Sequence, residues 1–359
     1  MDEGEKQQVR ILFVTTTDRT EHPYDDPSVR YRCYYLAKEL VRMGHTVDVI
    51  AKGPFESHYE ELPEYDAYIF HRPSWTVKFY DVCQLMKDKI RIASFDDFIF
   101  DISVVKKMPR FKSGIASFGE TANSLAKFFE GAAQFDYFMA STDNLREQMI
   151  RVFGVDEHKA VTIYNSVPDE VIATSKLARM QQKYKKFTLG YFPGTASHDL
   201  DWEVFSHAIQ DMKFDRPVDM LLVGPLNIDE VNPAIRIVRH DYVQFEELPF
   251  LMAQCQTIIA PLEDTIFNQA KSGLKFWESV LCGCRVLATP IPDINRFESP
   301  VLLKCRTAEE WRTNLDKVLC GELPEVTEQE ICRVERQVHI RTQAGRLMQF
   351  LKNIAEKTA

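Results

Sequence analysis

The chain has 359 residues, of which 45% are hydrophobic, 27% charged and 11% aromatic. This is the composition of an ordinary globular protein, and it argues against long disordered segments, collagen-like repeats and a coiled coil. The 44 basic and 53 acidic side chains give a formal net charge of −9, unlike a strongly basic nucleic-acid-binding protein. The length predicts roughly two domains.

The N-terminal residues lack the basic and apolar regions of a secretory signal, and no apolar run approaches the roughly 18 residues of a spanning helix. The eight cysteines include no Cys-x-x-Cys pair, and several lie in apolar stretches. We therefore expect a protein of the reducing cytoplasm, without a disulfide framework, a zinc site or a nucleic-acid partner.

In the first half of the chain, short apolar runs alternate with amphipathic stretches. The runs predict strands over 10–16, 46–51, 67–70, 90–95, 137–140 and 161–164. The stretches between them predict helices over 29–43, 121–131 and 144–153, and Gly44 is a plausible stop for the helix before it. Buried strands that alternate with helices are typical of a mostly parallel, doubly wound sheet.

The alternation stops near residues 171–187, where 177–186 are polar and basic, and this segment is the candidate junction. It then restarts, with strands predicted over 187–192, 218–223, 257–260 and 285–288 and helices over 200–212, 248–254 and 270–282. We therefore expect an α/β fold of two doubly wound Rossmann-like domains, 1–175 and 187–338, that face a central cleft. A C-terminal helix within 339–359 is expected to pack back on the first domain.

The loop Thr15–Arg30 is long, polar and contains prolines, and it leads into the first predicted helix. Ser28 or Asp26 could cap that helix, and the N-terminus of a helix favours an anion. The loop has no G-x-G-x-x-G sequence, which counts against a dinucleotide-binding enzyme. A solvated loop with surface arginines is the alternative.

Two further loops of the first domain follow predicted strands. His71 and Arg72 could meet a phosphate or a sugar hydroxyl, although a structural histidine is an equal alternative. Asp96 and Asp97 could serve in acid–base chemistry. Since neighbouring residues on an extended backbone point to opposite sides, only one carboxylate is expected to face the cleft, and no metal site is predicted.

In the second domain, the segment from Gly194 to Asp199 follows the first strand and precedes a helix. Gly194 permits a close approach of the backbone, and Thr195, Ser197 and the following amides could hold phosphate oxygens. A tight turn capped by Ser197 or Asp199 is the alternative.

The most informative pattern is Lys271, Lys275 and Glu278, which would share one face of a helix over 270–282. Two lysines near a helix N-terminus oppose the helix dipole, and this favours an anion there. Glu278 on the same face could accept two ribose hydroxyls, whereas the alternative is a surface ladder of Lys–Glu pairs.

These residues carry a resemblance to the GT-B fold glycosyltransferases, specifically the family-4-like group that uses nucleotide sugars. The stretch Lys271-Ser-x-x-Lys275-x-x-Glu278-x-x-x-x-Gly283-x-x-Val286-x-Ala288 resembles the donor-binding helix and following strand of that group. In the first domain, Arg30–Val47 is similar to the group's opening helix, and Ile163–Pro168 is similar to the segment that closes this domain. In the second domain, Tyr191–Asp201 is similar to the opening segment, and Leu222–Gly224 is similar to the end of a strand.

The resemblance implies an enzyme of polysaccharide biosynthesis, a hexosyltransferase that is retaining and metal-independent. It would move a sugar from a nucleotide sugar to a glycan, lipid-linked or protein acceptor bound by the first domain. The implied substrate is a UDP- or GDP-sugar, with no permanently bound cofactor. The implied donor-binding residues are Gly194, Thr195, His198, Gly224, Asn268, Lys271, Ser272, Lys275 and Glu278, with 245–248 beside the base. The candidate catalytic residues are His71, Asp97 and Lys271.

One departure from the family pattern concerns a Glu-x7-Glu pair, because Ala270 stands where the first glutamate is usual. Asn268 and Lys271 could take over its contacts. A nucleotide-sugar epimerase or hydrolase and a non-catalytic sugar-binding relative therefore stay as alternatives. The basic segment Lys106–Lys112 could touch the inner face of the membrane, or it could be a solvated loop.

Overall fold

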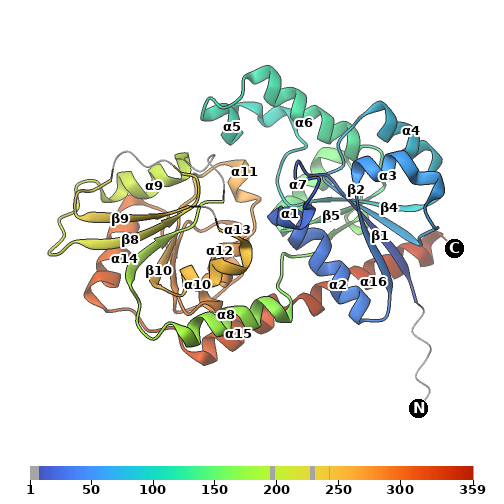
Figure 1. Ribbon diagram of the computed structural model, residues 1–359. Helices are drawn as coiled ribbons and strands as arrows, with labels where there is room; N and C mark the ends of the chain where they lie inside the picture. Colours follow the sequence, from blue (N-terminus) through green and yellow to red (C-terminus); the bar gives the residue numbers. More distant parts are fainter. Residues whose placement is uncertain (1–7, 195–198, 227–230, 242, 359) are drawn as a thin grey trace, which may run out of the picture.

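The computed structural model describes residues 8–194, 199–226, 231–241 and 243–358, and these form two six-stranded sheets (Figure 1). The first sheet has the order β2-β1-β3-β4-β5-β6, and the second has the order β12-β11-β10-β7-β8-β9. All the paired strands run parallel. We call the parts built on these sheets the first and the second domain. The predicted class of two doubly wound Rossmann-like domains is confirmed.

The strands of the first sheet are β1 (Arg10–Thr15), β2 (Thr46–Ala51), β3 (Ala67–His71), β4 (Ile90–Phe95), β5 (Tyr137–Ala140) and β6 (Ala160–Thr162). Those of the second are β7 (Phe187–Tyr191), β8 (Val218–Val223), β9 (Ile235–His240), β10 (Cys255–Ala260), β11 (Arg285–Ala288) and β12 (Leu302–Lys304). Strands β9 and β12 were not predicted. Both are edge strands with exposed residues, so they lack the continuous apolar run of a buried strand.

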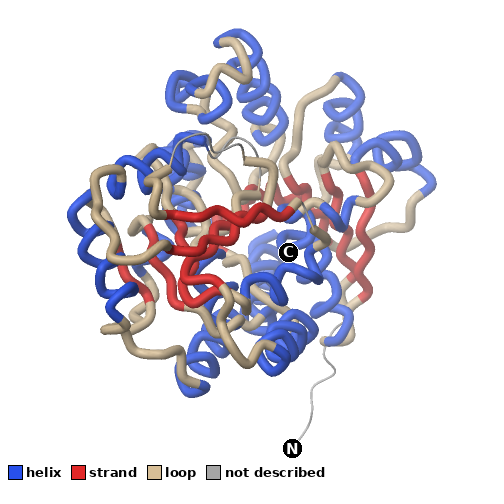
Figure 2. Tube along the Cα trace, turned by 60° about the vertical axis from the view of Figure 1, so that its left-hand side comes forward, coloured by secondary structure: helices blue, strands red, loops and turns tan. Residues whose placement is uncertain are grey.

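Helices cover both faces of each sheet (Figure 2), and the burial pattern of β1 shows why. Its alternate residues Ile11 and Phe13 lie in one buried cluster, whereas Leu12 and Val14 lie in another. Successive side chains of a strand point to opposite faces, so both faces of this strand are buried. A run of apolar residues without alternation is the sequence pattern of such a strand.

The helices before the crossing to the second domain are α1 (Pro27–Val29), α2 (Tyr35–Arg42), α3 (Lys52–His58), α4 (Val77–Leu85), α5 (Pro109–Lys112), α6 (Phe118–Ala132) and α7 (Asp143–Phe153). Those from the crossing onwards are α8 (Asp169–Gln181), α9 (Asp199–Ile209), α10 (Leu248–Met252), α11 (Ile266–Gln269), α12 (Leu274–Leu281), α13 (Pro292–Asn295), α14 (Ala308–Cys320), α15 (Glu328–Val338) and α16 (Ile340–Thr358). Short 3₁₀ turns cover 23–25, 59–61, 102–107, 157–159 and 245–247.

The helix predicted over 29–43 is divided in three. A π-helical turn, Arg30–Tyr34, separates α1 from α2. Asp26 caps α1, since its Oδ1 accepts a hydrogen bond of 2.9 Å from the Ser28 amide. Gly44 follows the end of α2 with a φ of +97°, the left-handed conformation predicted for a helix stop.

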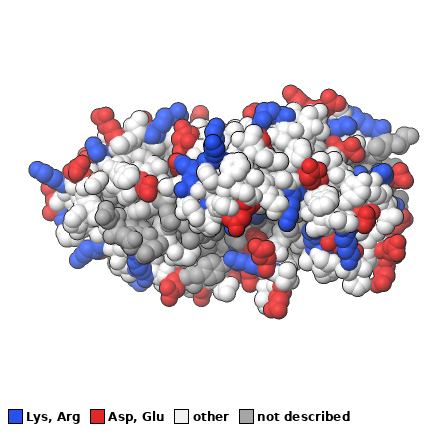
Figure 3. All heavy atoms as spheres, turned by 90° about the horizontal axis from the view of Figure 1, so that it is seen from above, with Lys and Arg blue, Asp and Glu red and all other residues white. Residues whose placement is uncertain are grey.

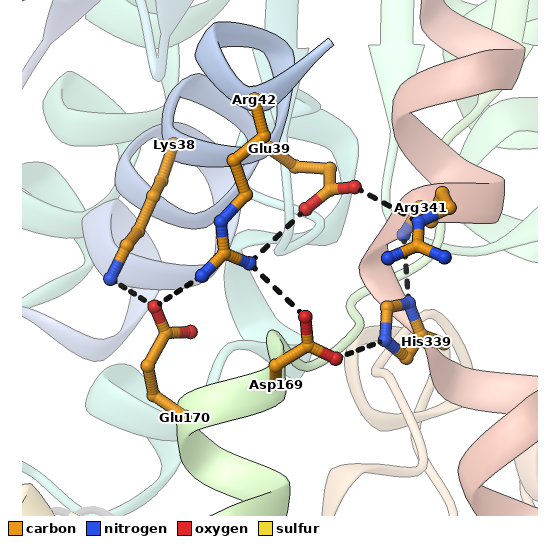
Figure 4. Close-up of polar contacts among 7 residues, drawn as sticks. All are labelled: Lys38, Glu39, Arg42, Asp169, Glu170, His339 and Arg341. Atoms are coloured by element: carbon orange, nitrogen blue, oxygen red, sulfur yellow. Dashed lines mark hydrogen bonds and ion pairs between the residues drawn. The ribbon is translucent and has the colours of Figure 1, made fainter.

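The chain crosses between the domains twice, and both crossings lie at one place. Val167 donates from its amide to Val338 and accepts from the amide of Ile340, each at 2.9 Å. Figure 4 shows the polar side chains that surround this point, where Asp169 lies 2.8 Å from His339 and 3.3 Å from Arg42. The same cluster contains ion pairs of Glu170 and Glu39 with side chains of α2 and α16: Lys38–Glu170, Arg42–Glu170, Arg42–Glu39 and Arg341–Glu39.

Helix α16 lies beside α2 and runs past the first sheet (Figure 1). Its apolar side chains, Ile340, Ala344, Leu347, Phe350, Leu351 and Ile354, belong to the same buried cluster as Leu36 and Leu40 of α2. The exact limits of the two domains stay a prediction, and α8 spans the predicted boundary at residue 175.

All eight cysteines are free, and six of them are buried. Within the part of the chain that the structure describes, no helix combines the length and the apolar character needed to cross a membrane. In the same residues, no group of three or more His, Cys, Asp or Glu side chains could hold a metal ion.

Candidate active site between the two domains

The segments that follow the strand ends of the two sheets touch one another. Thr142, after β5, donates from Oγ1 to the carbonyl oxygen of Ala270, after β10, at 2.8 Å. The guanidinium of Arg296, after β11, lies 4.2 Å from the ring centre of Tyr164, after β6. In parallel sheets, ligands bind outside the carboxyl ends of the strands. The candidate site therefore lies between these two facing edges.

The helix predicted over 270–282 is broken, because α11 ends at Gln269 and α12 begins at Leu274. Asp293 accounts for the start of α12, since its Oδ2 accepts hydrogen bonds from the Gly273 amide at 2.7 Å and from Ser272 Oγ at 3.3 Å. Lys271 therefore precedes α12 and does not share one helical face with Lys275 and Glu278. It is half-buried, its Nζ lies 5.1 Å from the Phe267 ring centre, and it forms no ion pair with any residue described.

Asn268 is buried beside the break between the two helices. Its Nδ2 donates to Asp201 Oδ1 at 2.9 Å and to the carbonyl oxygen of Glu263 at 3.0 Å. Its Oδ1 has no hydrogen-bond partner within the described ranges. A buried acceptor without a partner is costly, so this oxygen is suited to a donor group of a ligand.

Glu278 of α12 contacts both domains. Its Oε2 lies 2.9 Å from Lys275 Nζ, and its Oε1 accepts a hydrogen bond of 2.7 Å from the hydroxyl of Tyr31 in the first domain. Its side chain is 14% exposed. Glu278 lines a cavity of about 20 Å³ together with Phe245 and Leu248, the ends of the segment predicted to flank a base.

Two glycines predicted at the donor site lie at neighbouring loops. Gly224 follows β8 with a φ of +128°, and a Cβ there would lie 2.4 Å from the carbonyl oxygen of Pro193. Only glycine therefore allows the loop after β8 to approach the loop that ends β7. Gly194 is exposed beside Pro193, whereas Thr195 and His198 lie outside the described residues.

On the first domain, both adjacent carboxylates hold the same guanidinium. Arg72 donates from Nε to Asp96 Oδ1 at 2.8 Å and from Nη2 to Asp97 Oδ2 at 2.6 Å. The expectation that the two carboxylates point to opposite sides is therefore wrong. The alternation rule holds for extended strands, but β4 ends at Phe95 and the chain bends at the two aspartates.

Arg72 has a φ of +50°, which is uncommon for a residue other than glycine. Burial by itself would raise the pKa of Asp96, but the charge of Arg72 lowers this pKa below its usual range. A strained backbone and a partly buried charge cluster at a strand end are features that gather at functional sites.

His71 lies behind this cluster and is 0% exposed. Burial is the main cause that lowers its pKa to about 3, opposed by Asp96 and aided by Arg72. Its imidazole is therefore neutral near pH 7, and neither ring nitrogen has a hydrogen-bond partner among the residues described. Asp97 is more accessible, with 29% of its side chain exposed.

Sequence reasoning missed three residues that the structure brings to the site: Tyr31, Asp201 and Thr142. Each contacts a predicted site residue or its neighbour across a large separation in sequence. The only local signal was that Tyr31 and Asp201 stand within segments already quoted for the family resemblance. The contacts of Tyr31 and Thr142 depend on the packing of the two domains, and that of Asp201 depends on packing within the second domain. No local pattern encodes either.

Comparison with known proteins gives no match by sequence, since no protein-family profile and no curated protein matches the chain. Solved structures do match over nearly the whole chain. HepE from Anabaena, in complex with UDP and glucose, is 13% identical, with a TM-score of 0.60 over 96% of this chain and 100% of that one.

Two other solved structures match similarly. Sucrose-phosphate synthase from Thermosynechococcus elongatus is 12% identical, with a TM-score of 0.65 over 97% of this chain and 100% of that one. A glycosyltransferase from Rickettsia africae is 13% identical, with a TM-score of 0.61 over 97% of this chain and 99% of that one. At such identities the likeness concerns the fold, and this chain has the GT-B fold of two doubly wound domains whose facing edges hold the candidate site.

Proposed function

We propose that this protein is a glycosyltransferase that moves a sugar from a nucleotide-sugar donor to a glycan, lipid-linked or protein acceptor. The observation that carries the proposal is the contact of the segment 268–278 with the first domain at two points. Thr142 binds the carbonyl oxygen of Ala270, which stands between Asn268 and Lys271, and Tyr31 binds Glu278. These residues offer the Glu278 carboxylate, the buried amide oxygen of Asn268 and the Lys271 ammonium group, which has no ion pair among the described residues. Such groups suit a ligand that has both phosphates and hydroxyls. The structure of HepE with UDP and glucose supports the same reading.

In this proposal the donor is a UDP- or GDP-sugar bound by the second domain. Glu278 accepts the ribose hydroxyls, and residues 245–248 flank the base. Lys271 and the loop that begins at Gly194 face the diphosphate, with Thr195 and His198 in that loop. Gly224 keeps the neighbouring loop close, Ser272 fixes the turn before α12, and Lys275 orients Glu278.

Ala270 is proposed to mark a change in how the sugar is held. It is 0% exposed, and its carbonyl oxygen is bound by Thr142. A carboxylate at this position would be buried in an apolar cluster that includes Phe267. We assign two groups to the sugar instead: the Oδ1 of Asn268, which has no partner among the residues described, and the ammonium of Lys271.

The acceptor is proposed to bind the first domain near Asp97, whose carboxylate is held by Arg72 at an accessible strand end. His71 lies too deep to reach a substrate in this arrangement, so a catalytic role for it would require a rearrangement. We further propose transfer with retention and without a metal ion. Lys271 and the amide groups at the start of α12 could neutralise the leaving diphosphate.

Membrane contact is proposed for the segment 102–119, at the top of Figure 1. It has four basic side chains and no acidic one, and Ile102, Ile115 and Phe118 are about half exposed. From above, Lys and Arg side chains lie at the middle of this face beside uncharged surface (Figure 3). Such a mixture suits an anionic membrane and a lipid-linked acceptor at the cytoplasmic side.

The proposal is tested by Glu278→Ala and Lys271→Ala, each measured by calorimetric titration with UDP and GDP. A hydrogen bond to a charged group contributes about 1.5–3 kcal/mol, so each variant should bind the preferred nucleotide roughly 10- to 100-fold more weakly. Lys352→Ala and Glu356→Ala are matched controls, because this exposed pair lies on α16.

Nucleotide binding at wild-type strength in both Glu278→Ala and Lys271→Ala would refute the donor site. The reaction type is tested separately, by incubating the wild-type protein with the matching nucleotide sugar and no acceptor. A transferase leaves most of the donor intact, whereas a hydrolase releases free sugar and an epimerase yields an isomeric nucleotide sugar.

A further inference from the structure

The carboxylate assigned to the donor ribose is already engaged by the protein itself. Tyr31 and Lys275 each bind one oxygen of Glu278, at 2.7 and 2.9 Å. A carboxylate accepts hydrogen bonds through about four lone-pair positions, so two positions are already occupied. With its side chain only 14% exposed, Glu278 is largely covered from a ligand in this arrangement.

Tyr31 and its neighbour Arg30 also cover the segment assigned to the base. The Tyr31 ring packs edge-on against Trp277 and Phe245, with centroid separations of 5.9 and 6.2 Å. The Arg30 guanidinium lies 3.8 Å from the centre of the Phe245 ring. The cavity between Phe245, Trp277 and Glu278 measures about 20 Å³, enough for a single water molecule, so no nucleoside fits while Tyr31 stays there.

The backbone that carries Tyr31 is irregular. Arg30–Tyr34 form a π-helical turn, a type of turn that is found frequently at functional sites. Tyr31 is 3% exposed, and burial first, then the charge of Glu278, raises its pKa well above the usual value. The hydroxyl therefore keeps its proton near neutral pH, and it acts only as a hydrogen-bond donor to Glu278.

We propose that Tyr31 is a positioning residue that occupies the nucleoside site when no donor is bound and exchanges with the donor ribose on Glu278. This proposal rests on the donor site assigned above. When a nucleotide enters, the two domains part at Tyr31 and the ribose hydroxyls replace its hydroxyl on Oε1. The contact therefore competes with the donor and weakens its binding.

The test is Tyr31→Phe, which keeps the ring contacts and removes only the hydroxyl. The dissociation constants of UDP and GDP are measured by calorimetry for the wild-type protein and the variant. We expect the preferred nucleotide to bind roughly 10- to 100-fold more tightly to Tyr31→Phe, the factor that corresponds to one hydrogen bond to a charged group. Tyr35→Phe is the matched control, since Tyr35 is equally buried, packs against Tyr31 and forms no hydrogen bond with Glu278 within the described residues. It should bind as the wild type does.

A purely structural role for Tyr31 would give weaker binding, so unchanged or weaker binding in Tyr31→Phe overturns the proposal while the donor site stands. If neither the wild type nor Tyr31→Phe binds UDP or GDP, both proposals fail together. Amide hydrogen exchange of the wild-type protein provides a second measurement that needs no variant. Saturating UDP or GDP should speed exchange at Arg30–Tyr34, and slower exchange there would contradict the release of Tyr31.

Discussion

The buried imidazole of His71 makes the stability of the folded protein depend on pH. Burial is the main cause that holds its pKa at about 3. The charges of Arg72 and Arg32 act in the same direction, whereas Asp96, 3.9 Å from Nε2, and Asp26 oppose them. In an unfolded chain a histidine has a pKa of about 6.5. Between these two values the unfolded chain binds a proton that the folded protein excludes.

The sign and the size of the effect follow from this difference. The contribution of His71 is fully present above about pH 6.5, and it is lost progressively as the pH falls toward 3. One pKa unit corresponds to about 1.4 kcal/mol. At about pH 5, the pH lies roughly 1.5 units below the histidine pKa of the unfolded chain. Lowering the pH from 7 to about 5 should therefore remove about 2 kcal/mol of unfolding free energy.

The assay is urea unfolding of the wild-type protein and of His71→Phe between about pH 7 and 5. Phenylalanine keeps an aromatic ring and cannot titrate, and both ring nitrogens of His71 lack partners in the described part of the chain. The variant should lose about 2 kcal/mol less than the wild type over this range. His158→Gln, at an exposed histidine, is the control and should behave as the wild type. Parallel pH profiles for the wild type and His71→Phe would refute the reasoning.

Gly224→Ala should lower the unfolding free energy by about 2 kcal/mol or more. The alanine Cβ would lie 2.4 Å from the carbonyl oxygen of Pro193, and a φ of +128° is strained for any residue other than glycine. At Gly345, in α16, an added Cβ would meet no atom within 4 Å other than those of its own helix backbone and chain neighbours. Gly345→Ala should therefore be neutral or stabilising in the same urea titration, and equal losses in the two variants would contradict the steric argument. The wild-type protein should sediment with vesicles containing phosphatidylglycerol. Each basic residue contributes about 1 kcal/mol to binding at an anionic membrane. Reversing the charges of Lys106, Lys107 and Arg110 should therefore weaken binding to these vesicles by at least about 100-fold. Equal binding to neutral phosphatidylcholine vesicles would contradict an electrostatic contact.

Most strands could be predicted from the sequence because buried parallel strands have continuous apolar runs. The prediction failed at β9, where Arg236, Arg239 and His240 interrupt the apolar pattern of an edge strand. It also failed at the break before α12, because the side chain that caps this helix, Asp293, lies 20 residues farther along the chain.

The candidate site was predictable only where its residues are close in sequence. Lys271, Lys275 and Glu278 form a recognisable pattern on their own, although Lys271 lies before the start of α12. Of these three residues, Glu278 bonds directly to the first domain, through Tyr31. The bond between Tyr31 and Glu278 joins residues 247 positions apart. Such a contact is fixed by how the two domains pack, and the local sequence contains no information about that packing.

The position of α16 has a consequence for synthesis on the ribosome. This last helix supplies apolar side chains to the cluster that contains Leu36 and Leu40 of α2, although more than 290 positions separate Ile340 from these residues. The second sheet and the helices around it are complete once Val338 has emerged. The first domain keeps an apolar face open until α16 has been synthesised, so this domain is completed only after the second sheet, although its own strands come earlier in the chain.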